Sequence, residues 1–232
     1  MTSIFQELAK NLTQKGFSAN VGMEGAYGPS LSSNEEALDI INETVNNLNF
    51  NGKVFLAIDI AASEFYLEQE KLYSIKSSGV SLNEHQLLGM YEEWISKYPV
   101  MSIEDGLEEE SWEGWSVMNS RFSDKIKIIA DDLSVTNPTR VKRGIEEKAF
   151  TGCIIKPNQI GTLSETSEVI NLLKDNNLDY IISHRSGETD DTFISDLAVA
   201  SGAAFIKTGA PSRGERVAKY NRLLEIEREI NS

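Results

Sequence analysis

Six short apolar runs recur along the chain, and each ends in a charged or imidazole side chain. Continuous apolar runs of this length, bounded by polar stretches, are typical of strands that are covered on both faces of a sheet. A stretch with helical periodicity follows each run, so the pattern predicts six strand–helix units. The runs, with the residue that ends each, are 54–58 with Asp59, 100–103 with Glu104, 126–130 with Asp131, 153–155 with Lys156, 180–183 with His184 and 203–206 with Lys207.

Eight segments are predicted to be helical. The first is amphipathic, and the second begins at an N-cap formed by Ser33 or Asn34. Between the first two strands, residues 67–81 form an insertion that we expect to be a surface hairpin or loop. The predicted helices are 5–15, 34–48, 82–97, 112–122, 138–148, 162–176, 190–201 and 212–230.

The repeat of strand and helix predicts an α/β fold, either a TIM-like barrel or an open doubly wound sheet. Most strand ends are about 25 residues apart, which is the length that parallel strands with helical connections require. No glycine-rich nucleotide-binding motif follows the first strand, which argues against the open nucleotide-binding folds. Reactive residues at six successive strand ends favour a barrel. Because a complete barrel has eight strands, we predict an incomplete one, formed by a single domain of residues 1–232.

The C-terminal ends of the strands in such a barrel all open onto one face, where active sites lie. Three of the six strand-end residues are acids: Asp59, Glu104 and Asp131. A single acid there can be a helix cap or part of an ion pair, but three neighbouring carboxylates repel one another unless a cation holds them. Oxygen ligands without nearby cysteine or histidine predict Mg²⁺ or Mn²⁺. Asp132 repeats the acid after the third strand and is left as a supporting or capping group.

Basic and polar residues end the other three strands. Lys156 and Lys207 each end an apolar run, where partial desolvation favours a neutral amine that can act as a base; the alternative is a lysine that reaches the surface. His184 can donate a hydrogen bond to a substrate, although a lone histidine is more often structural. Arg185 and Ser186 can hold a phosphate through a guanidinium fork and a hydroxyl. The set therefore suits an anionic substrate.

A glycine-rich loop at residues 21–30 carries one further candidate, Glu24. Glycines permit tight turns and loop motion, so Glu24 can swing over a pocket as a general acid. The alternative is an exposed loop acid without a role.

Composition narrows the class of protein. The 232 residues carry a net charge of −14, which argues against binding to nucleic acid or to anionic membranes. No apolar run approaches the about 20 residues of a membrane span, and the N-terminus lacks a signal-peptide pattern, so we expect a cytoplasmic protein. The single cysteine, Cys153, lies in an apolar strand and is predicted to be a buried, inert thiol.

Several long motifs resemble enolase, the phosphopyruvate hydratase family, and the match is collinear from about residue 18 to 228. The resemblance implies the enolase barrel as the fold. It also implies Mg²⁺-dependent interconversion of 2-phosphoglycerate and phosphoenolpyruvate, a reaction of glycolysis and gluconeogenesis. The motifs are Gly22-x-Glu24-Gly25, Ala57-Ile58-Asp59, Ser102-Ile103-Glu104-Asp105, Ala130-Asp131-Asp132-Leu133, Lys156-Pro157-Asn158-Gln159, Ser183-His184-Arg185-Ser186-Gly187-Glu188-Thr189 and Ile206-Lys207-Thr208-Gly209-Ala210-Pro211.

The resemblance also implies a role for each candidate residue by its position in the motifs. Asp59, Glu104 and Asp131 match the ligands of Mg²⁺, and the latter two also face the substrate. Lys156 matches the base that removes the proton α to the carboxylate. The remaining matches are Lys207 with the lysine at the substrate carboxylate, Arg185 and Ser186 with phosphate contacts, His184 with a site histidine, and Glu24 with the acid that helps the hydroxyl leave.

The chain departs from the enolase pattern in two ways. The family carries an N-terminal domain and two barrel strands before the point where this sequence starts, so we expect a partner, either a separately encoded N-terminal half or a second copy of this chain. In the glycine-rich loop of residues 21–30, called the acid loop below, Met23 replaces an acidic neighbour of Glu24. Two alternatives to a split enolase therefore stay open: a non-catalytic enolase-derived binding protein, and another acid dehydratase of the same superfamily.

Overall fold

The structure, a computed structural model that describes residues 1–232, contains two compact units. One is continuous, Gly52–Tyr180, and the other combines Met1–Asn51 with Ile181–Ser232. Six strands follow one another in sheet order exactly as along the chain, β1-β5-β6-β7-β8-β9. The described strand pairs of this sheet are parallel. The prediction of an α/β fold with six strand–helix units, an incomplete TIM barrel, is confirmed.

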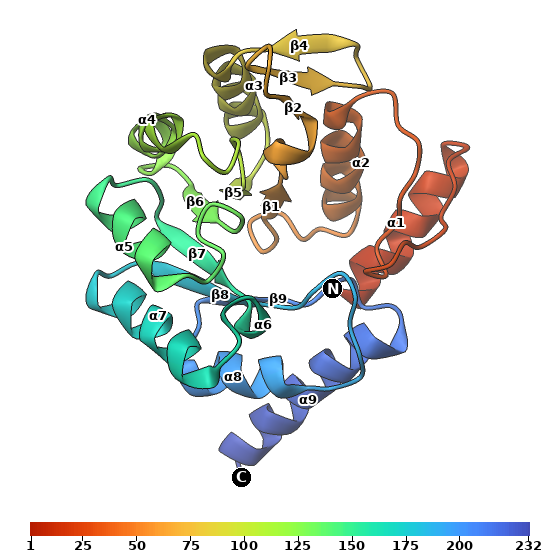
Figure 1. Ribbon diagram of the computed structural model, residues 1–232. Helices are drawn as coiled ribbons and strands as arrows, with labels where there is room; N and C mark the ends of the chain where they lie inside the picture. Colours follow the sequence, from red (N-terminus) through yellow and green to blue (C-terminus); the bar gives the residue numbers. More distant parts are fainter. The chain divides into compact units, whose positions relative to one another are not determined.

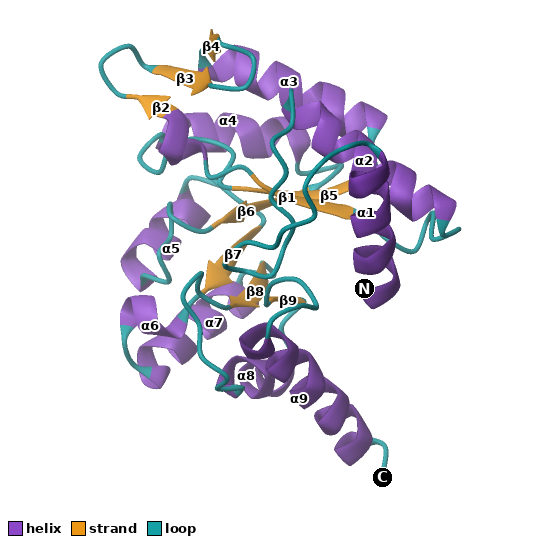
Figure 2. Ribbon diagram, turned by 90° about the vertical axis from the view of Figure 1, so that its right-hand side faces the viewer, coloured by secondary structure: helices purple, strands orange, loops and turns teal.

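The continuous unit contains a parallel ladder with helices along its outer side (Figures 1 and 2). The strands of the ladder are β1 (Leu56–Asp59), β5 (Val100–Glu104), β6 (Lys127–Ala130) and β7 (Gly152–Ile155). The helices are α3 (Glu84–Lys97), α4 (Trp112–Phe122), α5 (Pro138–Glu146) and α7 (Leu163–Asp175). A further strand, β8 (Asp179–Ser183), begins at the end of this unit.

Polar caps determine where these helices begin. The side chain of Asn83 accepts the backbone N–H of Gln86, whose side chain accepts that of Asn83, so α3 begins with a capping box. Asn137 caps α5, with Pro138 as its first residue, and Thr162 caps α7. Each cap satisfies backbone donors that the first turn of a helix leaves without partners.

A core of large apolar side chains lies between the ladder and its helices. Trp115, Tyr91, Phe122, Met118 and Ile128 are all fully buried. Burying each such side chain contributes about 1.5–3 kcal/mol, so these five stabilise the unit substantially.

The insertion between β1 and α3 is a three-stranded antiparallel sheet, where a hairpin or loop was predicted (Figure 1). A 3₁₀ helix, η1 (Ala62–Phe65), leads into β2 (Tyr66–Leu67), β3 (Leu72–Ile75) and β4 (Val80–Leu82). Tyr73 of β3 is fully buried, and its hydroxyl accepts the backbone N–H of Glu108 at 3.0 Å. The insertion is thereby fastened to the loop that follows β5.

The second unit consists of two helix pairs and a strand pair. In sequence order its elements are α1 (Thr2–Gln14), α2 (Asn34–Asn47), the end of β8, α8 (Phe193–Ser201), β9 (Phe205–Lys207) and α9 (Gly214–Ile230). Helix α1 contacts α2, and α8 contacts α9. Between α1 and α2, the buried Asn11 side chain donates to the Thr44 hydroxyl at 2.9 Å. Ser33 caps α2, one of the two predicted N-caps.

Two expectations from composition can be compared with the structure. Cys153 is completely buried in β7, as predicted. None of the helices combines the length and the apolar character that crossing a membrane requires.

Candidate active site

Carboxylates gather where β5 and β6 end. Glu104 is the last residue of β5 and Asp105 follows it, while Asp131 and Asp132 follow β6. One carboxylate oxygen from each of Asp105, Asp131 and Asp132 lies within 4.8 Å of the others. Asp105 and Asp131 are buried, so this triad is a donor set that can hold a metal ion.

Asp105 organises the loop after β6. Its two carboxylate oxygens accept the backbone N–H groups of Asp131 at 2.8 Å and Asp132 at 3.0 Å. Burial, reinforced by the carboxylates of Asp131 and Asp132, raises the pKa of Asp105 to about 7 against the lowering effect of the two N–H donors. Asp105 thus fixes the backbone that carries the other two acids.

Asp131 has one satisfied oxygen and one without a partner. Its Oδ2 accepts a hydrogen bond from the Lys156 ammonium at 2.5 Å. Its Oδ1 is buried and has no hydrogen-bond partner. A buried carboxylate oxygen without a donor is costly, and a hard divalent cation is the ligand that satisfies it.

Asp59 and Glu104 are the other two predicted metal ligands. They are the last residues of β1 and β5 and lie side by side, because their Cα atoms are partners in the parallel register. Glu104 is buried, whereas Asp59 is exposed and accepts the backbone N–H of Ala61 at 3.2 Å. The triad contains only Asp131 of the predicted trio, so the roles of Asp59 and Glu104 as ligands stay a prediction.

Lys156 is held at the start of α6 (Pro157–Ile160), a short helix that the sequence analysis did not anticipate. Its backbone N–H donates to the hydroxyl of Thr136 at 2.9 Å, and that hydroxyl donates to the Gln159 side chain at 3.1 Å. Only 15% of the Lys156 side chain is exposed. The structure therefore pairs a shielded ammonium with a shielded carboxylate at adjacent strand ends.

The second unit brings together Glu24, His184 and Ser186. The Ser186 hydroxyl donates to Glu24 Oε1 at 2.7 Å, and Glu24 Oε2 lies 3.6 Å from Nε2 of His184. The backbone N–H of His184 donates to the carbonyl of Lys207, the last residue of β9, at 2.9 Å. Four predicted site residues from three segments thus lie close together in this unit.

Burial keeps the His184 imidazole neutral. It lowers the pKa of His184 to about 4; Glu24 opposes that shift, while Arg216 and Lys207 reinforce it. Only 3% of His184 is exposed. At neutral pH the ring is therefore an uncharged hydrogen-bonding group.

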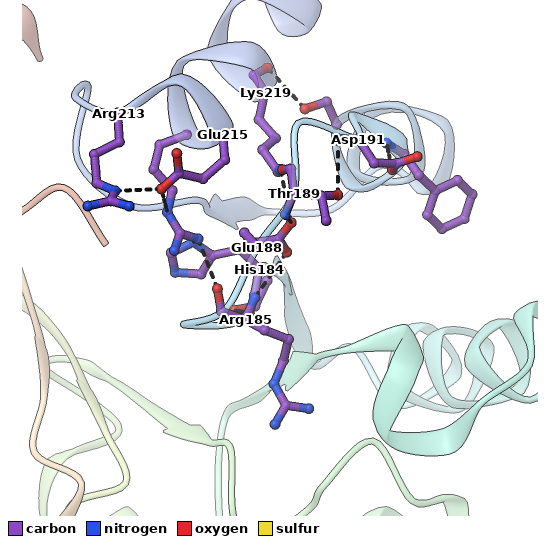
Figure 3. Close-up of polar contacts among 12 residues, drawn as sticks. His184, Arg185, Glu188, Thr189, Asp191, Arg213, Glu215 and Lys219 are labelled. Atoms are coloured by element: carbon purple, nitrogen blue, oxygen red, sulfur yellow. Dashed lines mark hydrogen bonds and ion pairs between the residues drawn. The ribbon is translucent and has the colours of Figure 1, made fainter. Parts of the chain in front are cut away.

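Glu188, which is half-buried, and the fully buried Lys219 form a second ion pair near His184. The Lys219 ammonium lies 3.0 Å from Glu188 Oε2 and donates to the carbonyl of Thr189 at 2.6 Å. Burial opposes ionisation of Glu188, but the hydrogen bonds from Lys219 and from backbone N–H groups lower its pKa below the ordinary value. In Figure 3 Lys219 reaches toward Glu188 and Thr189, whereas the Arg185 side chain extends away from the His184 ring.

Four residues of these clusters were not among the predicted site residues. Asp105 directly follows Glu104, so its position beside a strand end was the available signal. Arg216 and Lys219 are three residues apart on α9, a spacing that places both on one face of a helix. Charged residues at that spacing are ordinarily solvent-facing, and nothing in the pattern revealed that both are fully buried. Glu188 was recognised only as part of a motif.

Comparison with known proteins decides the family. The family model for the enolase C-terminal TIM barrel domain matches residues 1–232, the whole chain. The chain belongs to this family. It is also similar to the curated enolase of Natranaerobius thermophilus, at 48% identity over 229 residues. That match covers 98% of this chain and 53% of the relative, so the chain spans about half the length of the enolase it matches. The resemblance to enolase is thereby confirmed.

Proposed function

We propose that the chain supplies the C-terminal part of an enolase site, which interconverts 2-phosphoglycerate and phosphoenolpyruvate with Mg²⁺. The observation that supports this most directly is the environment of Asp131. One of its oxygens is bonded to the Lys156 ammonium, and the other is buried without a partner. A base and a metal ligand at adjacent strand ends of an enolase barrel are what removal of a weakly acidic proton requires.

In this proposal Asp59, Glu104 and Asp131 hold the Mg²⁺ ion, and Asp105 keeps the loop of Asp131 in place through backbone hydrogen bonds. When bound, the ion offsets the negative charge that develops on the substrate carboxylate. All of its proposed ligands are oxygens, which agrees with a hard cation.

Lys156 acts as the base. Its Nζ accepts the proton α to the substrate carboxylate, and it needs a free lone pair to do so. In the structure the Lys156 ammonium is engaged with Asp131. Its role as a base therefore requires that this ion pair with Asp131 opens. Lys207 offsets the charge of the substrate carboxylate.

Glu24 donates a proton to the leaving hydroxyl, which departs as water when the carbon–oxygen bond breaks. Its carboxyl group is held by the Ser186 hydroxyl and faces His184. Arg185 and Ser186 bind the phosphate group, and His184 donates a hydrogen bond within the site. Both Arg185 and Ser186 are exposed to solvent, so they are accessible to a phosphorylated ligand.

The partner in this proposal is the remainder of an enolase chain, because the relative is about twice as long as this chain. A separately encoded N-terminal half is the first candidate and a second copy of this chain is the other. We propose a cytoplasmic setting, where the substrates of glycolysis occur.

The test is the increase in ultraviolet absorbance from phosphoenolpyruvate when 2-phosphoglycerate and Mg²⁺ are added to the chain, alone and with an enolase N-terminal half. Lys156→Ala should lower kcat by about 100-fold or more, the usual loss of a general base. Lys142→Ala is the matched control, because the Lys142 side chain is 57% exposed and pairs only with Glu168. Chelation of Mg²⁺ should abolish the signal.

A non-catalytic binding role is the competing proposal, and the acid loop favours it. Met23, which stands where enolases carry an acid, is 63% exposed. Mg²⁺ binding without turnover, both alone and with the N-terminal half, would refute the enolase proposal and support the binding role. The alternative of another acid dehydratase predicts turnover of a non-phosphorylated sugar acid.

A further inference from the structure

Arg216, in the first turn of α9, is a fully buried cation whose hydrogen bonds converge on the His184 segment. Its Nη1 bonds to His184 Nδ1 at 2.7 Å and donates to the carbonyl of Arg185 at 2.8 Å. Its Nη2 donates to the carbonyls of Ser186 at 2.6 Å and Met23 at 3.2 Å. The four Nη hydrogens of a guanidinium thus meet four acceptors.

This geometry determines where the imidazole carries its proton. A guanidinium has donors only and stays protonated in proteins, so the ring nitrogen that faces it must offer a lone pair. Nδ1 of His184 therefore carries no proton. In the neutral ring the proton is then on Nε2, which faces Glu24 Oε2 at 3.6 Å.

We propose that Arg216 is a positioning residue that fixes His184 as the Nε2–H tautomer and holds the Glu24 loop beside it. The loop is held because the Met23 carbonyl, one residue before Glu24, accepts from the same guanidinium. The consequence for catalysis rests on the proposed function, whereas the tautomer itself does not. In the proposed reaction, the Nε2–H donor of His184 points toward the general acid, Glu24.

The packing around the guanidinium supports a dedicated site. A Cβ at Gly209 would lie 2.9 Å from Arg216 Cδ and 2.7 Å from the backbone oxygen of Glu24. The backbone N–H of Ala210 donates to that same oxygen at 3.1 Å. The turn after β9 therefore closes on both the arginine side chain and the acid loop, and only glycine fits there.

The charges that face His184 oppose one another, and burial of the ring favours its neutral form. Lys207 and Arg216 disfavour a second proton on the ring, while the carboxylates of Glu24 and Glu188 favour one. A proton on Nδ1 would also break the bond to Arg216 and place two cations in contact. The ring therefore stays neutral and keeps one tautomer over the range in which a free histidine titrates.

The first test leaves Arg216 and His184 unchanged. Long-range ¹H–¹⁵N spectra of the ¹⁵N-labelled chain distinguish protonated from unprotonated ring nitrogens, and the chain has only two histidines. His85→Gln assigns the signals, because His85 is exposed at the start of α3. Between about pH 5 and 8, His184 should show a protonated Nε2 and an unprotonated Nδ1. A protonated Nδ1, or averaging between the two tautomers, would overturn the proposal.

A second measurement tests the role of Arg216 itself. A ¹⁵N–¹⁵N coupling through the hydrogen bond should connect an Arg216 Nη with His184 Nδ1, and its absence would count against the proposal. In Arg216→Gln the ring should populate both tautomers, and the pKa of His184 should rise above that of the parent because one of the two cations that lower it is gone. Arg213→Gln is the matched control, since Arg213 is 46% exposed and bonds to Glu215. An unchanged tautomer in folded Arg216→Gln would refute the assignment, and the coupling still decides the matter if that variant does not fold.

Turnover separates this inference from the proposed function. If the chain is an enolase, Arg216→Gln should lower kcat with a smaller change in KM. The reason is that His184 and Glu24, which act during the chemical step, would no longer be held in position. A fixed Nε2–H tautomer without any turnover would contradict the proposed function alone. Turnover together with a protonated Nδ1 would contradict the positioning role alone.

Discussion

Acid should unfold this chain partly through one histidine. His184 is 3% exposed, and burial together with Arg216 and Lys207 lowers its pKa from 6.5 to about 4. In the unfolded chain the same ring accepts a proton at its ordinary pKa. As the pH falls below 6.5, the unfolded state therefore gains protons that the folded state does not, and the folded state loses stability.

The size of the effect follows from the width of that pH window. Each tenfold difference in proton affinity corresponds to about 1.4 kcal/mol, so a pKa lowered from 6.5 to about 4 corresponds to about 3 kcal/mol. This stability is fully present above pH 6.5 and is lost as the pH falls to about 4. Small domains have about 5–15 kcal/mol in total, so the loss is large.

Urea unfolding at a series of pH values measures the free energy of unfolding directly. His184→Asn is the informative variant, because the asparagine side-chain oxygen can still accept from Arg216 but does not titrate. The parent should lose about 3 kcal/mol more than His184→Asn between pH 6.5 and pH 4, and His85→Asn should follow the parent. Parallel curves for the parent and His184→Asn would refute the argument.

Four further predictions concern the continuous unit. Gly144→Ala should cost about 1–3 kcal/mol of unfolding free energy, because the new Cβ would lie 2.1 Å from Cε1 of the buried Phe150 ring. Gly89→Ala in α3 should instead raise the unfolding free energy by up to about 1 kcal/mol, since nothing lies within 4 Å of the new Cβ and alanine favours helix. Equal changes in unfolding free energy for the two variants would contradict both predictions. Burial raises the pKa of the Cys153 thiol, so a thiol reagent should label it only in denaturant, and rapid native labelling would show that β7 is accessible. Asn83→Ala should lower the free energy of unfolding by about 1 kcal/mol through loss of the capping box, whereas Asn83→Ser should retain most of it.

The strands and most helix starts were predictable because each depends on local chemistry. Parallel strands that are buried on both sides must be apolar. A charged residue at the end of such an apolar run is therefore easy to recognise in the sequence, and Lys156 after β7 is an example. Caps such as Ser33 and Thr162 satisfy the backbone next to them and therefore appear in the sequence beside the helix they start. These signals need no knowledge of distant residues.

The structure revealed what depends on contacts between distant residues. The four residues of α6 are too few to show a helical period, and the strands of the insertion are just as short. The burial of Arg216 depends on carbonyls up to 193 residues away, so its position on a polar helix suggested a surface side chain. Asp105 became distinctive only when its carboxylate was seen to accept two backbone N–H groups from the next strand end.

The composition of the second unit from both ends of the chain has a consequence for synthesis. The Met23 carbonyl is made early, but its donor Arg216 follows 193 residues later. At about 5–20 residues per second, a ribosome needs about 10–40 seconds to cover that distance. The continuous unit, residues 52–180, can fold in the meantime, whereas the loop around Met23 must wait for Arg216. Nascent chains should therefore expose the loop around Met23 to chaperones and proteases until the segment that contains Arg216 has been synthesised.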